Sequence, residues 1–156
     1  VGRMEDGMNE TDITLLADTI SQPDPERLAT MAADPWVRDM LIIHALTHAD
    51  TATLTRVGLG DRRPGSKTGR EVGRLLAEAF HHGIDTERTR RIRDRYANAP
   101  ASPGLTATIA YLDWVLGEQA TAMQRATDAM RRAPDMSLPA LVASLVRDNI
   151  TIEEHA

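Results

Sequence analysis

Apolar residues recur at helical spacing through the last third of the chain, and two helix-ending residues divide that stretch. Leu105, Ile109 and Leu112 occupy i, i+4 and i+7 positions, which lie on one face of an α-helix. Gly117 is a residue type that often ends helices, and Pro134 cannot continue one. The pattern predicts a helical hairpin between Leu105 and Pro134, and any fold of this chain must accommodate it.

The rest of the sequence favours helices as well. Ala, Leu, Met and Arg are strong helix formers and are plentiful, and no stretch alternates apolar and polar residues over the length of a strand. Aromatic residues make up only 3% of the chain, which is few for the core of a β-sandwich or barrel. We therefore predict an all-α protein, a multi-helix bundle of antiparallel hairpins with about seven or eight helices.

Proline, glycine and capping residues set the expected boundaries. Residues 1–10 show no periodic pattern and are predicted to be a flexible tail, followed by a single helical domain over 11–156. Asp24-Pro25 and Asp34-Pro35 each place an N-cap residue before a proline at the first helical position. The stretch 58–69 holds four glycines and one proline, which predicts a flexible loop. We expect helices over about 12–20, 25–32, 35–48, 70–82, 86–96, 105–116, 118–133 and from 137 onward.

Several classes of protein are excluded by residues that the chain lacks. It has no cysteine, which rules out disulfide scaffolds, iron–sulfur clusters and thiol nucleophiles. No apolar run approaches the roughly 18 residues of a transmembrane helix. No apolar segment follows the charged N-terminus, so no signal peptide is predicted. Together these features predict a cytoplasmic protein that does not associate with membranes.

Charge is distributed unevenly along the chain, whose net charge is −5. Residues 56–95 carry eleven basic and six acidic side chains, whereas the segments 1–55 and 96–156 are both acidic. The middle of the chain is therefore a basic zone, which is the kind of feature that contacts nucleic acid or an acidic surface.

The second helix of the predicted hairpin carries a stripe of small residues. Ala122, Ala126 and Ala129 lie at offsets that allow two antiparallel helices to approach closely, with Gly117 at the turn and Pro134 after the helix. This segment resembles the second half of a tetratricopeptide repeat. The first helix matches that repeat poorly, and a solenoid needs about three repeats. The resemblance therefore implies tetratricopeptide-like packing in the C-terminal third and not a repeat array.

A second resemblance covers more of the chain and involves Val37, Arg38, Asp39, Trp114, Gly117, Ala122, Ala129, Pro134, Ser137 and Leu138. At these positions the chain is similar to the C-terminal half of the DUF4192 family, actinobacterial proteins of unknown function. The resemblance implies a helical fold and transfers no catalytic residue, because that family has no established activity. Seventeen of the eighteen basic residues are arginine, which suits a bacterium with a GC-rich genome.

His44 and His48 lie four residues apart, on one face of the helix expected over 35–48. This spacing can chelate zinc, with a third ligand from His81, His82, Asp50 or another distant carboxylate. The alternative is that both histidines pack between helices or face solvent. We favour the alternative and predict no metal or cofactor, with His44 and His48 as the one candidate pair.

The loop sequence from Gly60 to Thr68 resembles a phosphate-binding P-loop in composition. In that motif a lysine directly follows the second glycine, but here Ser66 is inserted between Gly65 and Lys67. The preceding residues are also not a buried strand, so we interpret the loop as a connector.

The basic helix expected over 86–96 carries arginines at 88, 90, 91, 93 and 95, and Arg88, Arg91 and Arg95 are its candidate contacts to a partner. Such a cationic face suits nucleic-acid phosphates, although few aromatic residues are available to stack on bases. The alternative is a solvated face that pairs with the acidic N-terminal third.

The hairpin surface offers Trp114, Met123 and Met130 as contacts to a protein partner, because methionines adapt to varied surfaces. The alternative is that they belong to the core. No carboxylate pair or Ser-His-Asp set stands out, so no enzyme is predicted. The leading hypothesis is a protein-interaction module that binds a partner or a second copy of itself. The alternative is a nucleic-acid-associated protein that uses the basic zone 56–95.

Overall fold

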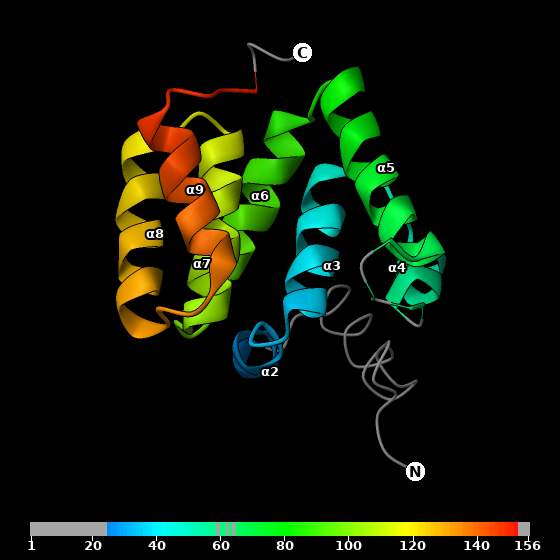
Figure 1. Ribbon diagram of the computed structural model, residues 1–156, viewed down its shortest axis with the longest axis horizontal. Helices are drawn as coiled ribbons and strands as arrows, with labels where there is room; N and C mark the ends of the chain where they lie inside the picture. Colours follow the sequence, from blue (N-terminus) through cyan, green and yellow to red (C-terminus); the bar gives the residue numbers. More distant parts are fainter. Residues whose placement is uncertain (1–24, 59, 62, 64, 153–156) are drawn as a thin grey trace.

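The computed structural model describes residues 25–58, 60, 61, 63 and 65–152 (Figure 1). Within these residues the chain forms helices and no strand, which confirms the all-α prediction. The predicted tail 1–10 and the predicted helix 12–20 lie outside the described residues. The helices are α2 (Pro25–Met31), α3 (Pro35–Leu46), α4 (Thr51–Gly58), α5 (Lys67–His82), α6 (Thr86–Ala97), α7 (Pro103–Val115), α8 (Gln119–Arg132) and α9 (Ser137–Arg147).

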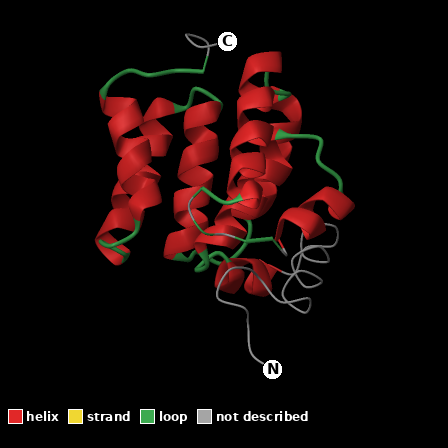
Figure 2. Cartoon of the chain, turned by 45° about the vertical axis from the view of Figure 1, so that its right-hand side comes forward, coloured by secondary structure: helices red, strands yellow, loops and turns green. Residues whose placement is uncertain are grey.

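The helices α3 and α7 form the centre of the bundle. Each is buried on nearly all sides, as expected for a helix that is apolar around its whole circumference. α7 packs against α8, α9, α6 and α3, while α3 also contacts α4 and α5. Figure 1 shows α7, α8 and α9 on one side of the molecule, α4 and α5 on the other, and α6 and α3 between them, with α2 lying across one end. Figure 2 shows the loops that join the helices.

Side-chain caps begin five of the described helices, among them α4, where Asp50 accepts a hydrogen bond of 2.8 Å from the Thr53 N–H. The Asp34 side chain accepts a hydrogen bond of 2.9 Å from the Trp36 backbone N–H, as its position before Pro35 predicts. Asp85 and Ser102 cap α6 and α7 in the same way. Ser66 caps α5 by accepting from the N–H of Gly69, so the last three residues of the predicted loop 58–69 are helical.

The predicted hairpin is formed by α7 and α8. Gly117 has a φ of 80°, and its N–H donates to the carbonyl of Trp114 while the N–H of Glu118 donates to that of Asp113. These two bonds are the Schellman motif, which satisfies the last carbonyls of α7 and turns the chain back. The three alanines of the stripe on α8 are fully buried, so α8 lies close to its neighbours. Whether the packing is tetratricopeptide-like stays a prediction.

None of the described helices combines the length and the apolar character that a membrane span requires.

Candidate functional site

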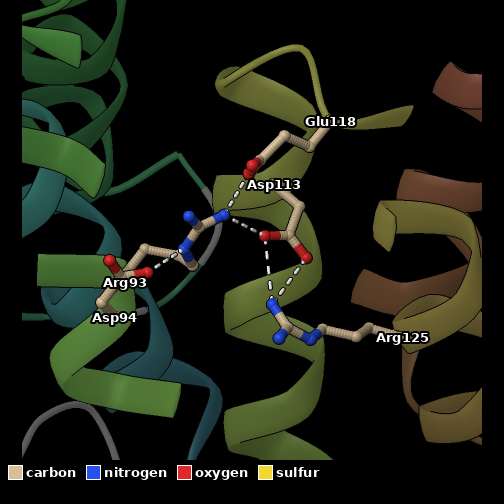
Figure 3. Close-up of polar contacts among 5 residues, drawn as sticks. All are labelled: Arg93, Asp94, Asp113, Glu118 and Arg125. Atoms are coloured by element: carbon tan, nitrogen blue, oxygen red, sulfur yellow. Dashed lines mark hydrogen bonds and ion pairs between the residues drawn. The ribbon is translucent and has the colours of Figure 1, made fainter. Parts of the chain in front are cut away.

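A carboxylate lies at the centre of the bundle with two arginines around it. Asp113 of α7 is fully buried, with none of its side chain exposed. Arg93 of α6 donates from Nη1 to Asp113 Oδ1 over 2.7 Å. Arg125 of α8 donates from its own Nη1 to both carboxylate oxygens, over 2.8 and 3.1 Å. Figure 3 shows the carboxylate between the two guanidinium groups, each from a different neighbouring helix.

Two further carboxylates contact Arg93 from the outside. Arg93 Nη1 also donates to Glu118, and its Nε donates to Asp94 Oδ1 over 2.8 Å. Although burial acts against it, hydrogen bonds to Glu118, Asp113 and Asp94 raise the pKa of Arg93. Burial raises the pKa of Asp113, and the two arginines oppose that shift. Because Asp113 accepts three hydrogen bonds from two arginines, we take its carboxylate as ionised at neutral pH.

The Asp113 carboxylate joins α6, α7 and α8, because it contacts an arginine from each of the two neighbouring helices. Asp113 and Arg125 were not selected from the sequence, and Arg93 was counted only among the arginines of the basic helix, although one signal was present. Asp113 lies among the apolar residues of α7, where an acidic side chain has to find a cation or stay protonated. The arrangement holds helices together, and Arg125 also lines a cavity.

The three arginines selected on α6 differ in their environment. Arg88 donates from Nη1 to the carbonyls of His44 and Ala45, over 2.6 and 3.2 Å, and so satisfies the end of α3. Arg91 and Arg95 are exposed. Arg88 thus contributes to helix packing, and the other two are the accessible members of the set.

The apolar candidates of the hairpin are largely taken up by the fold. Trp114 is buried, and its Nε1 donates to the carbonyl of Ile150 over 2.7 Å. Met123 and Met130 are partly buried against the core. Among the residues described, Leu141 of α9 is the one large apolar side chain that is exposed. The α7–α8 hairpin therefore offers little free apolar surface to a partner.

The predicted helix 35–48 is wrong at its end: α3 ends at Leu46, so His44 and His48 do not share a helix face, and they lie in different environments. His44 is partly buried, and burial, together with Arg88 and Arg95, lowers its pKa to about 4. His48 is exposed and lines a cavity of about 290 Å³ with His82, between the end of α3 and α5. In the described part of the chain, no three potential ligands gather in an arrangement that suits a metal ion.

Basic residues gather instead in a groove between α4 and α5. Arg56, Lys67, Arg70 and Arg74 line it together with the carboxylate of Glu71, around a space of about 440 Å³. Arg56 forms an ion pair of 2.6 Å with Glu71, and Arg74 lies 3.9 Å from the same carboxylate. Hydrogen bonding from Arg56 lowers the pKa of Glu71, so this residue is ionised at neutral pH. The groove carries four cations and one carboxylate, and it lies within the basic zone 56–95.

Asp39 of α3 gives the fold a pH dependence that can be measured. Burial raises its pKa to about 6, and Asp34 adds to this while Arg38 opposes it. A folded-state pKa above the unfolded value favours folding at low pH, and this contribution is lost as the pH rises from about 4 through 6. Asp39→Asn should therefore stabilise the protein at pH 8 by about 1–3 kcal/mol and much less at pH 4.

Urea denaturation of both proteins at several pH values measures this difference. Asp135→Asn, at an exposed position, is the control and should leave the stability unchanged at every pH. A destabilised Asp39→Asn variant at pH 8 would contradict the assignment, because it would mean that the ionised form is the favoured one.

Comparison of the chain with models of known protein families, with curated proteins and with solved structures finds no match. The resemblance to the DUF4192 family therefore stays a prediction, and the chain's own residues are the evidence for its function.

Proposed function

We propose that this protein is a helical interaction module that binds an acidic segment of a partner protein in the groove between α4 and α5. The observation that carries the proposal is the gathering of Arg56, Lys67, Arg70 and Arg74 around one open groove. Exposed cations that converge on one concave surface attract an anionic partner and orient it as it arrives.

Ion pairs restrain two of the arginines that line the groove. The side chains of Arg56 and Arg74 are each more than half exposed, yet Arg56 pairs with Glu71 over 2.6 Å, and Arg74 pairs with Glu78 over 2.8 Å and lies 3.9 Å from Glu71. Exposed ion pairs contribute little to stability, so these contacts serve mainly to limit where the two guanidinium groups lie. Lys67 and Arg70 are exposed in the first turn of α5.

An acidic protein segment suits this groove better than a nucleic acid does. None of the described residues that line the groove is aromatic, so they offer bases no ring on which to stack. The chain carries a net charge of −5. This charge repels a nucleic acid, whose negative charge is dense and extended, more than it repels a short acidic segment. Nucleic-acid association is thus the alternative outcome of the test below.

The test replaces two cations of the groove and compares the variant with a matched one elsewhere. Lys67→Glu with Arg70→Glu should weaken binding of a labelled oligoglutamate peptide by about tenfold or more in fluorescence anisotropy. Arg90→Glu with Arg91→Glu changes the charge equally at exposed positions of α6, and should have about a twofold effect or less.

Two results would overturn the proposal. Equal weakening by both double variants would mean that the peptide senses only net charge. Tighter binding of an oligonucleotide with the same number of charges, at equal salt, would favour the nucleic-acid alternative instead.

A further inference from the structure

A small cavity opens where the α6–α7 connection meets α7 and α8, away from the α4–α5 groove. Its volume is about 130 Å³. Ala97, Leu105 and Ile109 give it alkyl walls, whereas Thr106 and Arg125 give it polar groups. An engineered apolar cavity of roughly 150 Å³ holds benzene, so this one has room for about five or six non-hydrogen atoms.

Arg125 lines this cavity and has hydrogen-bond donors to spare. Both of its bonds to Asp113 start from Nη1, and within the described residues its Nε and Nη2 have no partner. Figure 3 shows these two nitrogens on the side of the guanidinium that faces away from Asp113. Nε and Nη2 together form the two-pronged edge that binds both oxygens of a carboxylate. The contact with Asp113 holds this edge in place before a ligand arrives.

The network holds two guanidinium groups and three carboxylates, but the contacts are shared unevenly, and Arg125 contacts only the carboxylate that it shares with Arg93 among the described residues. Asp113 is shared between Arg93 and Arg125, and the further carboxylates of Glu118 and Asp94 both contact Arg93. A ligand at this edge should therefore be an anion, and the alkyl walls require an apolar group attached to it. We infer that the cavity binds a small monocarboxylate with a short alkyl chain, whose carboxylate pairs with Arg125.

Isobutyrate is a suitable probe because it has six non-hydrogen atoms. Titration of the folded protein, followed by two-dimensional NMR, should give saturable shifts of the Thr106 and Ile109 amides, with a Kd of about 1 mM. Isobutyramide has the same shape without the charge and should bind at least about tenfold more weakly. Inorganic phosphate, which lacks the alkyl group, should shift these amides little.

Two variants separate the site from the stability of the fold. Arg125→Lys keeps a cation near Asp113 but lacks the two-pronged edge, and it should weaken binding about tenfold. Ala101→Leu enlarges an exposed residue that lines the cavity without touching the network, and it should abolish binding at an unchanged Tm.

Three results would overturn the inference. Isobutyramide or phosphate binding as tightly as isobutyrate would remove the carboxylate or the alkyl requirement. An Arg125→Lys variant that is folded and binds isobutyrate like the unmodified protein would remove Arg125 from the site. Shifts that fail to saturate by about 50 mM would indicate non-specific contact only.

Discussion

Replacement of Asp113 by alanine is expected to lower the free energy of unfolding by about 3–5 kcal/mol. The substitution leaves two guanidinium groups near the centre of the bundle without the carboxylate that they share. Arg125 loses the one carboxylate that it contacts among the described residues, whereas Arg93 keeps Asp94 and Glu118 but has only 10% of its side chain exposed to solvent. Urea denaturation followed by circular dichroism measures the effect.

Two further variants show whether the loss comes from the buried charge. Asp113→Asn keeps the shape of the side chain but removes its charge, and it should cost about 2 kcal/mol or more. Glu118→Gln removes a carboxylate that contacts the same arginine but is 40% exposed, and it should cost about 1 kcal/mol or less. An Asp113→Ala variant no less stable than Glu118→Gln would contradict a role for the network in holding the helices together.

The expected loss is the cost of leaving charges unpaired, and it is not the net contribution of the network to stability. Simultaneous replacement of Arg93, Asp113 and Arg125 by apolar residues of similar volume should be much less harmful than Asp113→Ala alone. This contrast distinguishes a network that drives folding from one that fixes which helices meet.

The sequence carried enough local information to predict the helical fold and the hairpin. Gly117 ends α7 because a left-handed residue is needed there, and the alanines at 122, 126 and 129 are buried because their spacing follows the helix. The Asp34 cap is equally local, since the side chain and the N–H it accepts from are two residues apart. Patterns of this kind can be read without knowing which helices pack together.

The polar network depends on contacts between helices, and spacing alone does not reveal these. Asp113 meets one arginine 20 residues before it and another 12 residues after it. The position of Arg93 was nevertheless accessible, because Thr89, Ile92, Arg93 and Tyr96 share one face of α6 and all are buried. The prediction instead chose Arg88, Arg91 and Arg95 for their charge. The charge of a side chain limits which groups it can bind, whereas its position on the helix determines which groups lie within its reach.

Contacts between distant segments also decide whether the hairpin candidates belong to the core or face a partner. Trp114, Met123 and Met130 were weighed both as core and as partner contacts, and the apolar pattern is the same for the two roles. The position of α9 decides between them, because the carbonyl of Ile150 just beyond it receives the indole N–H of Trp114. That contact spans 36 residues and depends on Asn149, whose φ of 54° turns the chain after α9. The basic groove likewise depends on how α4 lies against α5.

The second large effect is expected at Gly104, where α7 begins against the end of α2. A Cβ atom at this position would overlap the carbonyl oxygen of Ala32 and lie 2.6 Å from its carbonyl carbon. That oxygen cannot easily move, because Arg38 Nη1 donates to it over 2.9 Å. Ser102 also holds the two helices together by donating to the Ala29 carbonyl over 2.8 Å. Gly104→Ala should therefore destabilise the protein by about 3 kcal/mol.

Gly73 provides the matched control, because the same substitution there should act in the opposite direction. Gly73 lies within α5, is exposed, and has no atom within 4 Å of the place that a Cβ would occupy. Gly73→Ala should stabilise the protein by about 0.5–1 kcal/mol, since alanine restricts the unfolded chain and favours helix. Thermal and urea denaturation of the two variants give the sign directly. A neutral or stabilising Gly104→Ala would contradict this packing. It would mean that Gly104 and the Ala32 carbonyl lie further apart than described, and that Arg38 does not hold that carbonyl in place.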